Sequence, residues 1–203
     1  MRTSVVLLLA GCATTSSTPG PVLSNTVPGT GTASGALFVI RAESLGPITP
    51  STMATEDAIQ ELVGARYTVK KVDGDQIDVY LGDELLFYVI ATDGNALFNV
   101  HCPSSRIAIE EHPDWIIGAP LTNAAPLDGC ECWGPHPMCF AAGDHVAVGF
   151  DVPCRGEADF DTPGERKALI GVPIQRAVWN PRPFGEANGG SSPPTAKSIL
   201  TPP

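Results

Sequence analysis

The sequence has few basic residues, few aromatic residues and no recognisable catalytic motif. It holds 12 Lys and Arg against 22 Asp and Glu, so its formal net charge is −10. Nucleic-acid binding needs a basic face, and this function class is therefore not expected. Aromatic residues make up only 6% of the chain, and no segment matches a glycine-rich phosphate-binding loop. In contrast, 21 Gly and 20 Pro among 203 residues are an excess that excludes long helices and coiled coils.

The first twelve residues have the anatomy of an export signal. One positive charge in residues 1–4 precedes the apolar residues 5–10, which are too few to span a bilayer. This stretch ends in Leu9-Ala10-Gly11-Cys12, which resembles the lipobox of bacterial lipoproteins. The resemblance implies that residues 1–11 are a signal peptide and that Cys12 carries lipid chains such as palmitate, which anchor the protein without a transmembrane helix. Ala13 follows Cys12, and by resemblance to Gram-negative sorting this residue favours the outer membrane.

Composition divides the rest of the chain into three parts. In residues 13–35, 17 of 23 residues are Pro, Gly, Ser or Thr, and none is charged. Such a segment cannot bury enough apolar surface to offset the entropy of ordering it. We therefore expect a lipidated cysteine and flexible tether over 12–35, a single globular domain over 36–184, and a disordered tail over 185–203, where 12 of 19 residues belong to the same four types.

The first half of the domain predicts an antiparallel sheet with one packed helix. Residues 37–40 form a β-type run, and Thr55 can cap a helix over 56–63 that ends at Gly64. The apolar stripe of this helix is expected to consist of Ile59, Leu62 and Val63. Alternating apolar residues separated by turn signals predict a meander of strands within 67–72, 77–81, 85–91 and 97–101, in which 85–90 forms a fully buried central strand. The fold class is therefore α+β.

The second half of the domain is rich in proline and contains five cysteines. Short strands are expected at 106–109, 115–117, 145–152 and 174–179, with long connections between them. In an exported protein, the cysteines are first interpreted as a disulfide framework that stabilises this loop-rich half. Four of the five cysteines could form two bridges, which leaves one over. The favoured single pairing joins Cys130 or Cys132 to Cys139, and the other candidates are Cys102 and Cys154. Cys130 and Cys132 are too close in sequence to pair with each other without strain.

Several motifs, in their order and spacing, resemble a known family. They are the segments 46–49, 62–69, 93–94 and 117–121, the cysteine pair closed by Cys139 before a strand to Phe150, and the terminal strand 174–179. Together they are similar to the small sigma-E-regulated proteobacterial envelope lipoproteins of unknown function, over residues 46–181. The resemblance implies a lipid anchor and an α+β domain, and it brings no catalytic residues. The chain departs from the pattern at 154–173 and in its extra cysteines.

Two function classes follow from these observations. The preferred class is a non-enzymatic accessory or binding protein of the bacterial envelope, attached to the membrane through Cys12 and acting on another envelope protein or a ligand. No cofactor is expected. The alternative is an envelope hydrolase or a redox or metal-binding protein that uses the segment 130–145, either through soft ligands (Cys130, Cys132, Cys139, His136 and His145) or through an unpaired cysteine beside a histidine (His101, His112 or His145).

Overall fold

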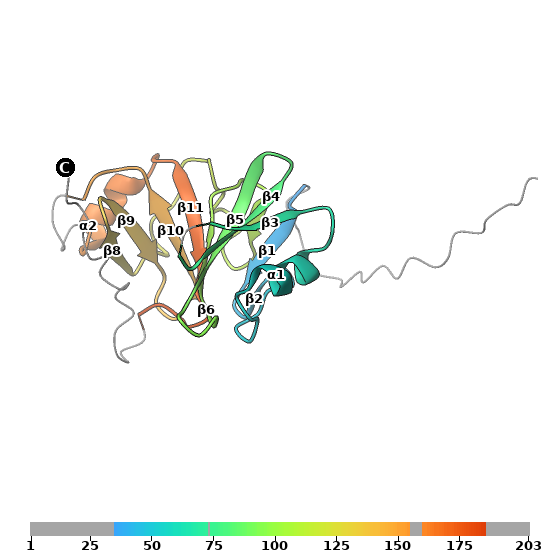
Figure 1. Ribbon diagram of the computed structural model, residues 1–203. Helices are drawn as coiled ribbons and strands as arrows, with labels where there is room; N and C mark the ends of the chain where they lie inside the picture. Colours follow the sequence, from blue (N-terminus) through green and yellow to red (C-terminus); the bar gives the residue numbers. More distant parts are fainter. Residues whose placement is uncertain (1–34, 73, 155–159, 186–203) are drawn as a thin grey trace, which may run out of the picture. The chain divides into compact units, whose positions relative to one another are not determined.

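Most of the ordered structure consists of antiparallel strands. A computed structural model describes residues 35–72, 74–154 and 160–185 (Figure 1). The expected signal peptide, Cys12, nearly all of the tether and the tail from residue 186 onward lie outside the described residues. No helix in the described part is long and apolar enough to cross a membrane.

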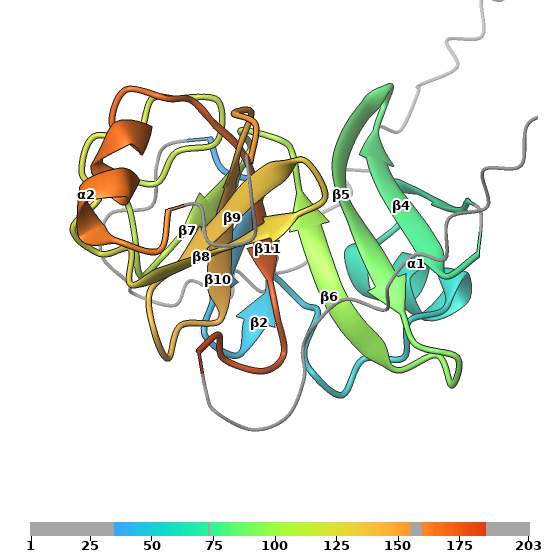
Figure 2. The ribbon, with the colours of Figure 1, turned by 90° about the vertical axis from the view of Figure 1, so that its left-hand side faces the viewer.

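Eight strands form one large sheet, in the order β3-β4-β5-β6-β11-β10-β9-β8. All neighbouring pairs are antiparallel. The first four strands are the predicted meander, whereas β11, the last strand in sequence, lies between β6 and β10 (Figures 1 and 2). The strands are β3 (Thr68–Lys71), β4 (Gln76–Leu81), β5 (Glu84–Ala91), β6 (Leu97–Cys102), β8 (Gly129–Trp133), β9 (His136–Phe140), β10 (Val146–Phe150) and β11 (Ile174–Trp179).

A small sheet packs beside the large one. Its order is β2 (Ser44–Leu45), β1 (Phe38–Arg41) and β7 (Ile107–Ile109), and β1 pairs with β7 in parallel. The chain turns after β2 at Gly46, whose φ of +54° lies in the left-handed region. A Cβ atom at this position would come within 2.6 Å of the Phe38 ring, so only glycine fits the turn against that ring.

Helix α1 (Glu56–Val63) begins and ends where the sequence predicts. The Thr55 side chain caps its N-terminus, and Gly64 follows its last residue with φ +88°. The helix also protects the edge strand β3, because the side chains of Gln60 and Glu56 accept hydrogen bonds from the backbone N–H groups of Val69 and Lys71. An edge strand with free N–H groups is a site of unwanted pairing, and α1 removes two of them.

The structure contains the one expected packed helix and adds a second, short helix. This second helix, α2 (Pro163–Arg166), continues into a 3₁₀ turn over Lys167–Leu169. Thr162 and Glu165 form a capping box at its start, with Pro163 in the first turn. The segment was interpreted as loop because its apolar pattern is too short to show a helical period.

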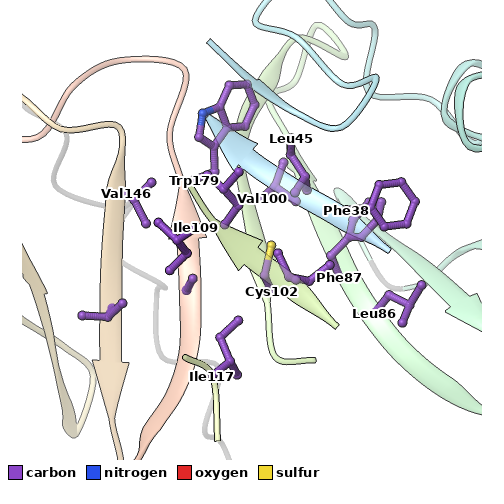
Figure 3. Close-up of a cluster of buried hydrophobic side chains, with 14 of the residues drawn as sticks. Phe38, Leu45, Leu86, Phe87, Val100, Cys102, Ile109, Ile117, Val146 and Trp179 are labelled. Atoms are coloured by element: carbon purple, nitrogen blue, oxygen red, sulfur yellow. The ribbon is translucent and has the colours of Figure 1, made fainter. Parts of the chain in front are cut away.

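The core lies on one face of the large sheet, against the small sheet, α1 and the loops that follow β7 (Figure 3). Val100 and Trp179 on the large sheet and Leu45 on the small sheet are fully buried, and the Trp179 Nε1–H donates to the carbonyl of Ala42 across the two sheets. Within α1, Ile59 is fully buried but Leu62 is 40% exposed. The predicted apolar stripe of the helix is therefore wrong at Leu62.

The second half of the domain differs from expectation in two places. Residues 129–140, expected to be a loop, form the β8–β9 hairpin. Residues 115–117, expected to be a strand, pair only through one bridge between Ile117 and Ile174. Trp115 in that segment is nonetheless 1% exposed, so its side chain fills the core while its backbone belongs to a loop.

Candidate functional site: the second face of the large sheet

The face of the large sheet opposite the core, which we call the second face, carries a continuous row of side chains. Residues directly opposite each other in a sheet point to the same side. The register of the seven strand pairs places one residue of each strand in the row, in the order Lys70, Asp78, Tyr88, His101, Val178, Ala147, Phe140 and Gly129. The row changes from polar side chains on β3 to β6 to apolar ones on β11 to β9.

The apolar end of the second face has its own small cluster. Met138, Ala147, Val178 and Phe184 are buried together, and Trp133 and Phe140 pack against them. Phe184 follows β11 and stacks on Phe140 with ring centroids 5.3 Å apart. This end of the face is thus covered by the chain itself.

The sheet curls so that its β8 end approaches β6, in the middle of the second face. The Trp133 ring on β8 lies 6.2 Å from the His101 ring on β6. These strands are four steps apart in the sheet order, and in a flat sheet four steps span about 19 Å. In Figure 2, β8 and β9 lie on one side of β6, and β4 and β5 lie on the other. The curvature makes a concave surface with Tyr88, His101 and Trp133 on its walls.

His101 is held in its neutral form at the centre of this surface. Burial, and secondarily the charge of Arg176, lowers its pKa from the ordinary 6.5 to about 4. Its ring stacks on Tyr88 at 4.6 Å with an interplanar angle of 5°, and burial raises the pKa of Tyr88. Within the described residues, the buried His101 Nδ1 and Asn99 Oδ1 atoms have no hydrogen-bond partner. Both are on β6 and both belong to the second face.

Asp78, the acidic residue of the row, is structurally satisfied. It is 5% exposed and accepts hydrogen bonds of 2.7 Å from the Tyr80 hydroxyl and of 2.7 Å from the Gln76 amide. The hydrogen bond to Asp78 raises the pKa of Tyr80. Its oxygens are engaged within its own strand, so it is a poor candidate for a ligand contact.

A hollow of about 280 Å³ opens beside this surface. It is lined by His136, Gly149, Phe150, Asp151, Gln175 and Arg176. Arg176 extends across Gly149, since a Cβ atom there would lie 3.1 Å from Arg176 Cγ and 3.2 Å from its Nε. The absence of a side chain at position 149 thus determines where the guanidinium of Arg176 lies.

The cysteines are mostly engaged in disulfides. Cys130 pairs with Cys139 across the β8–β9 hairpin, and Cys132 pairs with Cys154. The first bond is one of the two pairings that the sequence left open. Cys102 is a free thiol with no exposed surface, and burial raises its pKa. No group of three or more metal-ligating side chains occurs among the described residues, and thiolate ligation by Cys130, Cys132 and Cys139 is incompatible with these bonds.

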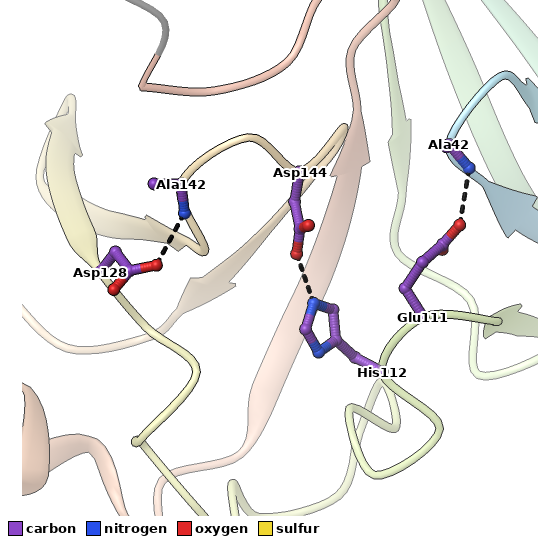
Figure 4. Close-up of polar contacts among 6 residues, drawn as sticks. All are labelled: Ala42, Glu111, His112, Asp128, Ala142 and Asp144. Carbon is purple, nitrogen blue, oxygen red and sulfur yellow. Dashed lines mark hydrogen bonds and ion pairs between the residues drawn. The ribbon is translucent and has the colours of Figure 1, made fainter.

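A second polar cluster fastens loops together (Figure 4). Glu111 accepts from the backbone N–H of Ala42, and Asp144 contacts His112 at 2.5 Å. Asp128 accepts from Ala142 N–H in the same way. The adjoining hollow measures only about 40 Å³, which is room for little more than a water molecule. We interpret this cluster as a set of structural contacts that hold the loops together.

The structure thus gathers residues that the sequence interpretation kept apart. Trp133 and His136, the latter from the proposed metal cluster, lie on the second face with His101, whereas His112 and His145 lie elsewhere. Tyr88 and Arg176 were missed. The strand β5 also contains Glu84 and Phe87, and β11 also contains Gln175 and Trp179, so the sequence held no signal that singled out either residue.

The fold and the second face define a disulfide-bonded, mainly antiparallel β-domain with a curved sheet and a polar concave surface. The structure is similar to the crystal structure of the uncharacterized protein yfeY from Escherichia coli, with a TM-score of 0.50 and 20% sequence identity. The match covers 68% of this chain and 97% of that chain. At this identity the similarity shows the fold alone. No protein-family model matches the sequence, and the comparison with curated proteins gave no match.

Proposed function

We propose that this protein is a lipid-anchored protein of the bacterial envelope, held in the outer membrane through Cys12, that acts by binding and not by catalysis. The observation that supports the binding role most is the concave second face, where Tyr88, His101 and Trp133 surround polar atoms that no described residue satisfies. Buried polar groups without partners are costly in a folded protein, and a ligand removes that cost where side-chain movement on the second face brings it within hydrogen-bond distance of these atoms.

The disulfides support the proposed compartment. Two bonds, Cys130–Cys139 and Cys132–Cys154, stabilise the proline-rich half of the domain, and such bonds persist in oxidising compartments outside the cytosol. The lipobox-like Leu9-Ala10-Gly11-Cys12 motif and the uncharged segment after it fit a domain tethered to a membrane. The family resemblance over residues 46–181 has the same implication.

The state of the thiols weakens the enzymatic alternative. A nucleophilic cysteine needs a lowered pKa and access to substrate, whereas Cys102 is buried and burial raises its pKa. It lies on the core side of β6, and its neighbour His101 lies on the opposite side. The two side chains cannot act as a pair.

The anchor is tested in a Gram-negative host that expresses the full chain. Mass spectrometry of the mature protein is expected to show an N-terminal Cys12 carrying acyl chains, and fractionation is expected to place it in the outer membrane. Globomycin treatment and the Cys12→Ser variant should both prevent processing. An unlipidated protein, or a mature N-terminus elsewhere, refutes the anchor.

The binding role is tested by the emission of Trp133. An envelope extract, separated into small-molecule and macromolecular fractions, is added to the purified protein and to the Trp133→Phe variant. One fraction should shift the emission of the first protein and not of the second, because the other two tryptophans are buried in the core. The macromolecular fraction would identify an envelope protein as partner. An unchanged spectrum, or the same shift in both proteins, contradicts binding at the second face.

A further inference from the structure

The hollow beside the second face contains two opposite charges that do not pair with each other. Arg176 and Asp151 both belong to its lining. The ion pairs among the described residues join neither Arg176 to any carboxylate nor Asp151 to any lysine or arginine. Within the described residues, the hollow therefore holds a guanidinium without a carboxylate partner and a carboxylate without a lysine or arginine partner. Such a hollow is complementary to a molecule that carries both charges in the opposite sense.

Arg176 is placed to receive the negative group. Its stem crosses the bare backbone of Gly149, and its charge lowers the pKa of His101, so the guanidinium lies near the centre of the concave surface. The guanidinium remains charged at all relevant pH values and presents a planar set of donors that fits a carboxylate in two parallel hydrogen bonds. The guanidinium donates a hydrogen bond to the Tyr88 hydroxyl, and within the described residues no carboxylate pairs with its remaining N–H groups.

Asp151 is placed to receive the positive group. Its side chain is 70% exposed, and its one described partner is His136, whose Nδ1 atom lies 3.6 Å from Oδ1. That distance is too long for a hydrogen bond. The carboxylate therefore keeps its acceptor sites for an incoming ammonium group, while the neighbouring Gln175 offers an amide that can donate and accept.

The volume of the hollow limits the size of the ligand. At about 280 Å³ it lies just below the range of pockets that hold drug-sized molecules. Trp133 is directly opposite His136 in the β8–β9 register, so an indole stands at the rim and can pack against an aromatic or aliphatic side chain.

We propose that this hollow binds a small zwitterion of the amino-acid type, with its carboxylate on Arg176, its ammonium on Asp151 and its side chain against Trp133. The proposal rests on the binding role given above and names the class of ligand. A free amino acid and a dipeptide share this chemistry and differ only in the separation of the two charges.

Four probes test the proposal by calorimetric titration into the purified protein. They are L-phenylalanine, the dipeptide Ala-Phe, phenylalanine amide, which has only the ammonium, and N-acetylphenylalanine, which has only the carboxylate. One of the two zwitterions should bind about tenfold or more tightly than either singly charged analogue, as expected for loss of a charge-assisted hydrogen bond. Whichever zwitterion binds more tightly identifies the charge separation. Equal affinities for all four, or no saturable binding of either zwitterion, overturn the proposal.

Variants then assign the two charges. In Arg176→Gln, the zwitterion should no longer bind more tightly than phenylalanine amide, which lacks the carboxylate. In Asp151→Asn, the zwitterion should no longer bind more tightly than N-acetylphenylalanine, which lacks the ammonium. Gly149→Ala keeps both charges but brings a Cβ atom within 2.6 Å of Met138 Sδ and within 3.1 Å of Arg176 Cγ, so both side chains must shift and all ligands that carry a carboxylate should bind more weakly.

Arg106→Gln is the matched control for these variants, because Arg106 is 48% exposed and pairs with Glu84 outside the hollow. Unfolding midpoints show that each variant is folded. A preference that survives Arg176→Gln or Asp151→Asn refutes the assignment. If the probes fail while an envelope fraction still shifts the Trp133 emission, the ligand class is wrong and the binding role stands.

Discussion

The buried His101 makes the stability of the domain depend on pH in a calculable way. Its pKa is about 4 in the folded protein against an ordinary 6.5, so the unfolded chain binds more protons between these values. Stability contributed by the neutral ring is therefore complete above pH 6.5 and is lost as the pH falls toward 4. The whole shift corresponds to about 3 kcal/mol, of which about 2 kcal/mol is lost between pH 7 and pH 5.

The measurement is urea unfolding of the wild type and of His101→Phe at pH 7, 6 and 5 and constant ionic strength. Phenylalanine keeps a flat ring against Tyr88 and does not titrate. Other groups titrate alike in both proteins, so the difference between their free energies of unfolding should shift by about 2 kcal/mol in favour of the variant. Tyr88→Phe is the control and should keep the wild-type pH dependence. Parallel pH profiles for wild type and His101→Phe would refute the reasoning.

Three further predictions concern the core, a turn and the free thiol. Ile59→Ala should cost about 3 kcal/mol in urea unfolding and Leu62→Ala less than about 1 kcal/mol, because the first side chain is fully buried and the second is 40% exposed; equal losses would contradict the observed helix orientation. Gly46→Ala should destabilise more than Gly82→Ala, since both have positive φ but only at Gly46 does a Cβ meet a ring; the reverse order in thermal unfolding would contradict that contact. A chromogenic thiol reagent should label Cys102 only after unfolding, with the signal absent in Cys102→Ala, and labelling of the native protein would contradict its burial.

The elements with strong local signals were predictable from the sequence. Helix α1 has a capping threonine, an acidic first turn and a terminal glycine, and the meander has alternating apolar residues with turn signals between them. Both patterns depend on residues close in sequence. The predicted full burial of 85–90 is wrong for a related reason: Tyr88 and Ile90 are only partly buried because the second face is open, and an apolar composition does not reveal which face a core covers.

The β8–β9 hairpin could not be predicted because Gly129, Glu131 and Pro137 belong to residue types that are depleted in strands. Pro137 has no N–H to donate, but it lies beyond residues 138–140, the part of β9 that pairs with β10. A proline is therefore tolerated at this position of β9, because no N–H group is needed there to pair with β10. The candidate site could not be predicted from the sequence either. Tyr88, Trp133 and Arg176 come from three strands, and only the curl of the sheet brings them together.

The position of β11 has a consequence for how the chain folds during synthesis. This strand is the last to emerge, yet it pairs with both β6 and β10. Until residues 174–179 arrive, each of these strands presents a valine-containing edge without a partner, and such edges invite pairing between chains. A chain truncated before Ile174 would retain both edges permanently. The large sheet is therefore complete only when residues 174–179 have joined β6 to β10.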